Sequence, residues 1–145
     1  MSVAIADELL ALRNDNGVIN PGEVVTWAKN NPGSRLHASL EWDDALAGER
    51  WRREQVRGLI AVHVTDADGS RKLISLSIDR TASGGYRPLD EVLGQPTLRE
   101  VMLKDALAEL DRVQKKYEKL QELERVWLAA SQVREGRASR RKAAA

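Results

Sequence analysis

The feature that most constrains this chain is a long helical pattern near its C-terminal end. Apolar residues recur at three- and four-residue spacing over residues 97–134, with one three-residue slip, a stammer in coiled-coil terms, along the way. With Thr97 as its N-cap, such a helix is roughly 50 Å long, longer than a domain of this size is wide. Part of it can fold back on the domain, but one helix cannot bury the stripe alone. We therefore predict a dimer formed through Leu103, Leu110, Val113, Tyr117, Leu120 and Trp127.

A second helical segment begins at Glu41-Trp42-Asp43-Asp44 and covers residues 45–60. Either aspartate can accept hydrogen bonds from the free N–H groups of the first turn. Gly48 and Gly58 are weak helix formers, at about 1 kcal/mol each relative to alanine, so we expect another element to pack closely against them. Because the chain has no Phe, both tryptophans of this segment are expected in the core. Its apolar stripe consists of Ala47, Trp51, Val56, Leu59 and Ile60.

Another side of this helix carries three aligned arginines, Arg50, Arg53 and Arg57, at positions i, i+3 and i+7. Two interpretations are open. Glutamates are interspersed among the arginines, so the side can be a solvated face held by local Glu–Arg pairs. Alternatively, three aligned guanidinium groups can bind phosphates, which is typical of a helix that contacts DNA.

Short helices are expected before this segment. Residues 3–12 form the first, and Gly17 is a natural left-handed stop after it. Asn20-Pro21-Gly22-Glu23 is a strong start signal for a second helix that ends near Lys29, with Asn as cap and Pro at the first position. Ser34 can cap a third. Two short helices with a tight break between them are typical of a helix-turn-helix.

After Ile60 the pattern changes from helical to alternating, which predicts a β-hairpin over about residues 61–79 with Asp68-Gly69 in its turn. Arg71 and Lys72 would then lie near its tip. The hairpin is either a wing that reaches a DNA groove, as in winged-helix proteins, or a plain cover for a helical core. Roughly a dozen residues separate the second short helix from the helix over residues 45–60, which departs from the usual tight spacing of winged-helix proteins.

The C-terminal end holds the basic excess of the chain. Residues 98–145 contain twelve Lys/Arg against eight Asp/Glu, whereas the whole chain has a net charge of only +1. We predict a flexible basic tail over residues 135–145 that adds salt-dependent phosphate contacts, although such tails are also common without function. Its cations are Arg137, Arg140, Arg141 and Lys142.

The predicted fold is therefore α+β and mainly α. Residues 1–93 form a helical, helix-turn-helix-like domain with a β-hairpin wing, and residues 97–134 form a coiled-coil-like helix. The flexible tail follows.

The residues offer no catalytic signature. There is no Cys, which excludes thiol chemistry, and His37 has no second His or Cys at a metal-ligand spacing, so we expect it to be structural. Asp43 and Asp44 are better explained as a helix cap than as an acid–base pair. We expect no enzyme activity, metal, cofactor or small-molecule substrate. Without a leader or a membrane span, a cytoplasmic location is expected.

Several blocks spread over residues 17–130 resemble small uncharacterised proteins encoded in phages and prophages of bacteria. The resemblance implies a phage or prophage setting inside a bacterial host cell, and it carries no established chemistry. The blocks are Leu36-His37, Glu41-Trp42-Asp43-Asp44, Trp51-Arg52, Gln55-Val56-Arg57-Gly58-Leu59-Ile60, Tyr86-Arg87-Pro88-Leu89, Lys116-Tyr117 and Leu120.

Taken together, the sequence predicts a non-enzymatic protein, regulatory or architectural, that binds duplex DNA as a dimer. Its contacts would be the arginine stripe, the cations of the hairpin tip and the basic tail. The alternative is a protein–protein interaction or virion-assembly module that acts through the long helix. Salt-sensitive binding of duplex DNA separates the two hypotheses.

Overall fold

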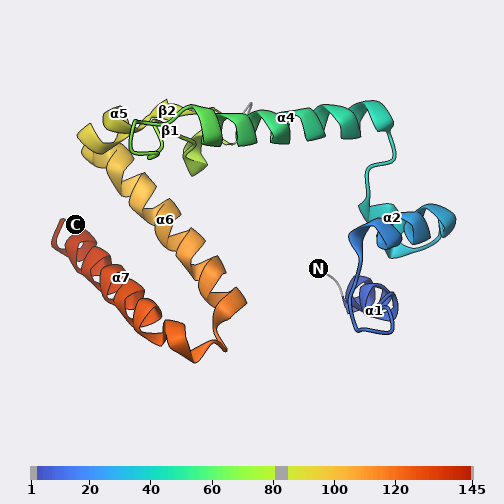
Figure 1. Ribbon diagram of the computed structural model, residues 1–145. Helices are drawn as coiled ribbons and strands as arrows, with labels where there is room; N and C mark the ends of the chain where they lie inside the picture. Colours follow the sequence, from blue (N-terminus) through green and yellow to red (C-terminus); the bar gives the residue numbers. More distant parts are fainter. Residues whose placement is uncertain (1–2, 81–84, 145) are drawn as a thin grey trace. The chain divides into compact units, whose positions relative to one another are not determined.

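The computed structural model describes residues 3–80 and 85–144, and the chain divides into two compact units, residues 1–57 and 58–145. The described residues are mainly helical, with a small antiparallel sheet of two strands (Figure 1). The mainly helical α+β class is therefore confirmed. The unit boundary falls inside a helix, and each unit has its own packing.

The first unit contains helices α1 (Val3–Ala11), α2 (Pro21–Asn30) and α3 (Arg35–Ser39) and the first part of α4 (Asp44–His63). The connection from α1 to α2 takes residues 12–20, which is longer than the turn of three or four residues in a helix-turn-helix. The tight break expected between these helices is therefore a longer loop. The core consists of buried Val24, Ala28 and Leu36, with Ile5, Leu9, Leu12, Ile19, Trp27 and Trp42 packed around it.

Side-chain caps set the helix starts in this unit, as the sequence predicts. The Asn20 side chain accepts hydrogen bonds from the N–H groups of the first turn of α2, and Ser34 accepts one from the His37 N–H at 3.0 Å. Asp43 caps α4, because its Oδ1 accepts hydrogen bonds from the N–H groups of Ala45 and Leu46 at 2.9 and 3.1 Å. Gly17 has the positive φ, 78°, that the sequence indicates.

One cap comes from a distant part of the chain. The carboxylate of Glu8, on α1, accepts hydrogen bonds from the backbone N–H groups of Arg35 and Leu36 at 3.1 and 2.9 Å. These are the first N–H groups of α3, which have no partner within a helix. Glu8 therefore fixes α1 against the start of α3.

The predicted β-hairpin does not form as expected. Residues 61–63, assigned to its first strand, continue α4 to His63. The chain does reverse after α4, because Gly69 has a φ of 84° and the Asp66 N–H donates to the Ser70 carbonyl at 2.8 Å. An isolated bridge joins Thr65 to Arg71, but no ladder follows it. A two-stranded ribbon is marginal in water, whereas continuing a helix gains one backbone hydrogen bond per residue.

The strand that does form pairs elsewhere. Strand β1 (Leu73–Ile74) runs antiparallel to β2 (Arg87–Pro88), and a 3₁₀ turn, η1 (Ser77–Asp79), lies between them in the chain. Arg87 forms a bidentate ion pair with Asp79, at 2.7 and 2.8 Å, which connects β2 to η1. The sequence also predicts a loop over residues 80–88; residues 81–84 of it lie outside the described residues, and Arg87 and Pro88 form β2.

The rest of the second unit is built on α6 (Pro96–Tyr117). Helix α5 (Leu89–Gly94) and η1 pack against α6, and the Asp105 carboxylate accepts a hydrogen bond from the Ser77 N–H at 2.8 Å. Leu76 and Val92 are fully buried in this layer. Helix α6 begins at Pro96 rather than after a Thr97 cap, because Pro at the first position needs no partner for its nitrogen.

The predicted single helix over 97–134 is two helices. The chain turns after Tyr117, passes through a 3₁₀ turn, η2 (Gln121–Leu123), and returns as α7 (Glu124–Ala144) antiparallel to α6 (Figure 1). The break falls at the stammer in the apolar pattern, without a Gly or Pro to mark it. Leu107 and Ala130 are buried between the helices. The long helix therefore packs partly on its own chain.

Candidate interaction surfaces

The three arginines of α4 are exposed and each is paired with a glutamate. Arg50 lies 3.3 Å from the Glu41 carboxylate, Arg53 lies 2.7 Å from that of Glu49, and Arg57 pairs with Glu54. The two pairs within α4 are the local pairs of a solvated helix face. Exposed pairs of this kind contribute about 0–1 kcal/mol each, so a phosphate can replace the glutamate at little cost. Phosphate binding by this face stays a prediction.

The other side of α4 is apolar and exposed. None of the 20 residues of α4 is buried, and Trp51, Leu59 and Val62 are exposed by 64, 56 and 70%. At about 100° per residue these three side chains share one face of the helix. We call them the α4 stripe. The expectation that Trp51 lies in the core is wrong, whereas Trp42 does pack against the core of the first unit.

The glycines of α4 are not explained by packing within the chain. A Cβ atom at Gly58 would meet nothing within 4 Å, and one at Gly48 would meet only the Arg52 side chain. The expectation that another element packs closely against them is therefore wrong for the described residues.

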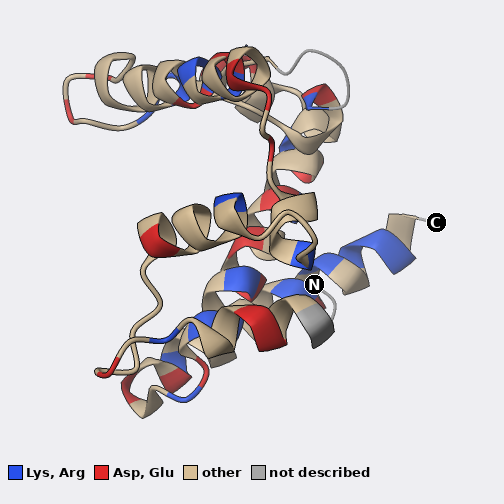
Figure 2. Ribbon diagram, turned by 90° about the vertical axis from the view of Figure 1, so that its right-hand side faces the viewer, with Lys and Arg blue, Asp and Glu red and all other residues tan. Residues whose placement is uncertain are grey.

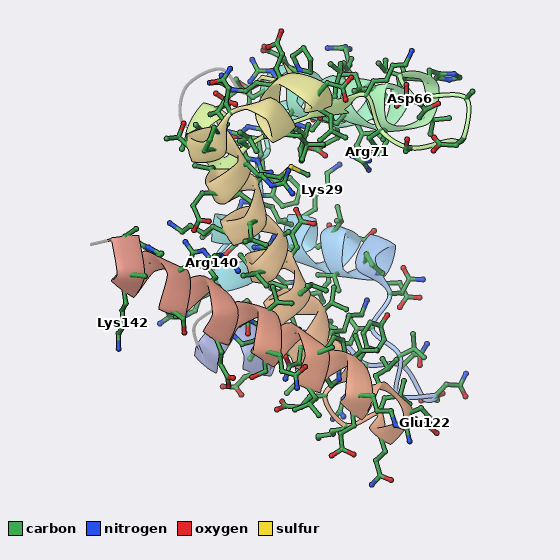
Figure 3. All side chains as sticks on the ribbon, turned by 90° about the vertical axis from the view of Figure 1, so that its left-hand side faces the viewer. Lys29, Asp66, Arg71, Glu122, Arg140 and Lys142 are labelled. Carbon is green, nitrogen blue, oxygen red and sulfur yellow. The ribbon has the colours of Figure 1, made fainter. Side chains whose placement is uncertain are left out.

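The cations of the expected hairpin tip lie on the reversal after α4. Arg71 and Lys72 are exposed, and Lys72 Nζ lies 3.9 Å from the Asp66 carboxylate. Figure 3 shows Asp66 and Arg71 on this loop. The same short loop carries Asp68, whose pKa is lowered by hydrogen bonds from the Ser70 hydroxyl and backbone. Because the two carboxylates balance the two cations, this loop has no basic surplus.

The expected flexible tail is a helix, and its cations have two different environments. Arg137 Nε donates to the Glu100 carboxylate of α6 at 2.5 Å, and its side chain is only 18% exposed. Arg140, Arg141 and Lys142 are exposed on the last turns of α7, where they form most of a basic end (Figure 2). Arg140 and Lys142 point to different sides of the helix (Figure 3). Arg137 is therefore a structural residue, and the other three are available to a ligand.

The six residues predicted to form a dimer separate into two groups. Leu103 and Trp127 are half-buried in the second unit, where the chain's own helices cover them, and Trp127 Nε1 is buried with no acceptor among the described residues. The others, Leu110, Val113, Tyr117 and Leu120, remain exposed. Only the second group is accessible to another molecule.

One flank of the α6–α7 hairpin is apolar. At about 100° per residue, apolar residues of α6 and of α7 lie on the same side of the contact between the two helices. They form one continuous surface because the helices run antiparallel beside one another. The five large apolar residues of this flank are between 37 and 47% exposed, and the exposed Ala106 and Ala129 lie between them. At the turn end, Lys116 Nζ lies 5.2 Å from the ring centroid of Tyr117. The apolar flank consists of Leu110, Val113, Tyr117, Val126 and Val133.

The opposite flank of the same hairpin is polar. The same geometry places Asp111 and Lys115 there, joined by an ion pair of 3.0 Å that lowers the pKa of Asp111, with Glu118 beyond them. From α7 it receives Glu124 and Glu135. The two-helix layer is therefore amphipathic across its width, with apolar side chains on one flank and charges on the other.

His37 is structural, as the sequence predicts. Its Nδ1 lies 2.9 Å from the Ala28 carbonyl, and its ring stacks on Trp42 with centroids 4.6 Å apart. The Trp42 indole N–H donates to the His37 carbonyl at 2.8 Å. These contacts join α2, α3 and the segment just before α4.

The first unit has an open hollow of about 600 Å³ beside α2. Asn20 caps α2 with its side-chain oxygen, and Thr26 donates to the Gly22 carbonyl, so both are occupied by backbone partners. Across the described ranges 3–80 and 85–144, no three His, Asp or Glu side chains are grouped to hold a metal ion. The hollow is lined by Leu12, Asn20, Gly22, Glu23, Thr26, Trp27 and Asn30.

Sequence reasoning missed two residues of the apolar flank. Val126 and Val133 fall outside the apolar stripe of one continuous helix, and they join Val113 and Leu110 only because the chain turns back. The stammer between Leu120 and Leu123 was the available signal.

Comparisons with family models, with curated proteins and with solved structures find no match. Among the described residues, no helix combines the length and apolar character that crossing a bilayer requires.

Proposed function

We propose that this chain is a non-enzymatic protein–protein interaction module that works through exposed helical surfaces, as a component of an assembly. The observation that carries the proposal is the α4 stripe. Trp51, Leu59 and Val62 lie on one face of a continuous helix of 20 residues with no buried side chain. Exposed apolar stripes of this kind mark surfaces that another protein covers, and a helix face is a common anchor.

The virion-assembly form of this proposal rests on the phage or prophage setting that the sequence resemblance implies, inside a bacterial host cell. Tryptophan is enriched where interfaces gain most of their binding energy, so Trp51 is the expected anchor. Gly58, two helical turns after Trp51, leaves room for a close approach of a partner backbone, because a Cβ atom there would meet nothing within 4 Å.

Duplex-DNA binding by a dimer is the second candidate, and a separate observation favours it. Arg140, Arg141 and Lys142 are exposed at the end of α7 with no acidic residue beyond Glu135. Arg50, Arg53 and Arg57 of α4 and Lys72 of the following loop are paired with carboxylates, which weakens their share of this candidate. The DNA-binding candidate also includes the predicted helix-turn-helix and wing. The long loop from α1 to α2 weakens the first of these, and the absence of a hairpin ladder after α4 weakens the second.

Two matched variants separate the candidates. The first replaces Leu59 and Val62 with Glu, and the second replaces Arg140, Arg141 and Lys142 with Glu. All the sites are exposed, so the circular dichroism spectra should match that of the wild type. Each protein is used to capture partners from host cells that carry the phage or prophage, and each is titrated with labelled duplex DNA at about 50 and 200 mM salt.

The interaction proposal expects one partner to be captured by the wild type and by the second variant but not by the first. It also expects no tight DNA binding. DNA binding that weakens steeply with salt and disappears in the second variant would instead establish the second candidate. Equal capture by all three proteins would remove the α4 stripe from the proposal.

A further inference from the structure

We propose that the apolar flank of the α6–α7 hairpin is covered by the same flank of a second copy, so that two chains form an antiparallel four-helix bundle. This inference does not involve the α4 stripe. It therefore stands or fails separately from the proposed function.

The hairpin alone leaves too much apolar surface in water. Between its helices only Leu107 and Ala130 are buried among the described residues, while all five residues of the apolar flank are exposed. A layer of two helices with one apolar flank is half of a four-helix bundle, whose core forms when two such layers face one another. The polar flank, with Asp111, Lys115 and Glu135, would remain in water.

The size of the layer fits a stable dimer. Two helices of about 20 residues, with axes about 10 Å apart, present a layer about 30 Å long and 20 Å wide. Covering it on both copies buries about 1,200 Å² in total, which is the lower end of the range for stable, specific interfaces. A single partner helix would cover about half of this width.

Side-chain size favours a copy of the same layer. Ala106 and Ala129 lie among the larger residues of the apolar flank, so each layer presents hollows as well as projections. Large side chains of one layer can enter the positions of the alanines in the other, which is how helical layers interdigitate. A two-fold axis uses every such contact twice.

Charge selects the antiparallel arrangement. The open end of the hairpin carries Arg99, Arg140, Arg141 and Lys142, all exposed, whereas cations and carboxylates alternate near the turn, where Glu122 lies (Figure 3). With both turns at the same end, the two basic ends would lie together and repel one another. With the turns at opposite ends, the basic ends are separated by the length of the bundle.

The first test is the mass of the full-length chain in solution by light scattering coupled to size exclusion. The expected mass is twice the 16.2 kDa of one chain. Val113→Glu combined with Val126→Glu should give the mass of one chain with an unchanged circular dichroism spectrum. Leu128→Glu is the matched control, because Leu128 is an exposed apolar residue on the far side of α7, and this variant should remain a dimer.

The second test fixes the arrangement. Because the chain has no Cys, a single introduced cysteine is a clean probe. Leu110→Cys, near the middle of the flank, should form a disulfide-linked dimer, whereas Tyr117→Cys, at the turn end, should not. A monomeric wild type, or a Val113→Glu/Val126→Glu variant that remains a dimer, would overturn the proposal. Crosslinking by Tyr117→Cys without Leu110→Cys would overturn the antiparallel bundle.

Discussion

Helices α4 and α6 have nearly the same length, 20 and 22 residues, and both carry an apolar stripe beside charged residues. Their surroundings differ. Helix α6 is covered on one side by α5 and η1 and on another by α7, whereas no residue of α4 is buried. An apolar stripe therefore predicts that a helix forms, but it does not predict whether the same chain supplies the cover.

The cause of the difference lies in the segments that follow the two helices. After α6 the chain reverses and returns as a helix of 21 residues, long enough to follow α6 back. After α4 the reversal at Asp66–Ser70 returns only as far as the Lys72 N–H, which donates to the Val64 carbonyl, and β1 then pairs with β2 instead. The α4 stripe therefore stays exposed.

The largest expected effect comes from equal truncations in the two helices. Leu107→Ala removes a side chain buried between α6 and α7 and should lower the free energy of unfolding by about 2–4 kcal/mol. Leu59→Ala removes an exposed side chain of α4 and should change it by about 0.5 kcal/mol or less. Urea denaturation followed by circular dichroism measures both. Similar losses for the two variants would show that α4 is covered within the free protein.

The second effect concerns the return helix. Arg137→Met removes the half-buried ion pair with Glu100 and should lower the free energy of unfolding by about 1–2 kcal/mol, because a charge-assisted hydrogen bond is lost and Glu100 keeps its charge. Amide exchange over residues 134–144 should also become faster. Arg141→Met, at an exposed position one turn later, is the control and should have little effect. Equal exchange in both variants and in the wild type would mean that the pair does not hold the end of α7.

The third effect tests whether α4 is free of close neighbours. Gly58→Ala should raise the free energy of unfolding by about 0.5–1 kcal/mol, because alanine favours the helix and its Cβ meets nothing within 4 Å. Gly69→Ala should lower it, since Gly69 has a φ of 84° that alanine adopts only with strain. Destabilisation by Gly58→Ala would place a close neighbour against α4 in solution.

The accuracy of the sequence predictions follows the distance over which each signal acts. Asn20, Ser34 and Asp43 cap helices that begin within three residues, so the chemistry of the residue and its neighbours decides the outcome. Gly69 makes its turn for the same reason. The cap from Glu8 to α3 crosses 28 residues of sequence, and no local pattern indicates it.

The two main errors of fold concern competition between structures. Residues 61–63 suit a strand, but the helix that precedes them already exists and extends at low cost, while a strand needs a partner. The break after Tyr117 has neither Gly nor Pro, so the helical pattern on both sides suggests continuity. In each case the result depends on contacts that form only in the folded chain.

For the candidate site, the sequence identified the residue types better than their roles. Arg50, Arg53 and Arg57 lie on one side of α4 as predicted, and their glutamate partners were the alternative left open. Arg137 was grouped with the mobile cations but belongs to the α6–α7 contact, because its partner Glu100 is 37 residues away.

The fourth and smallest effect concerns the layer of β2 and η1 beside α6. Arg87 donates two hydrogen bonds to Asp79 and holds the pKa of that carboxyl below its ordinary value. Because the folded-state pKa is lower than that of the unfolded chain, the pair stabilises the fold above about pH 4, and this contribution is lost as pH falls through the folded-state value.

Asp79→Asn should therefore be less stable than the wild type at pH 6, and the difference should shrink as the pH is lowered below 4. Urea denaturation at a series of pH values measures the difference. Asp44→Asn is the control, because Asp44 is an exposed aspartate in the first turn of α4, outside the layer on α6. A difference for Asp79→Asn that stays constant down to pH 3 would mean that the ion pair with Arg87 does not hold β2 and η1 together, and the cover of α6 on that side would then depend on Leu76 and Val92 alone.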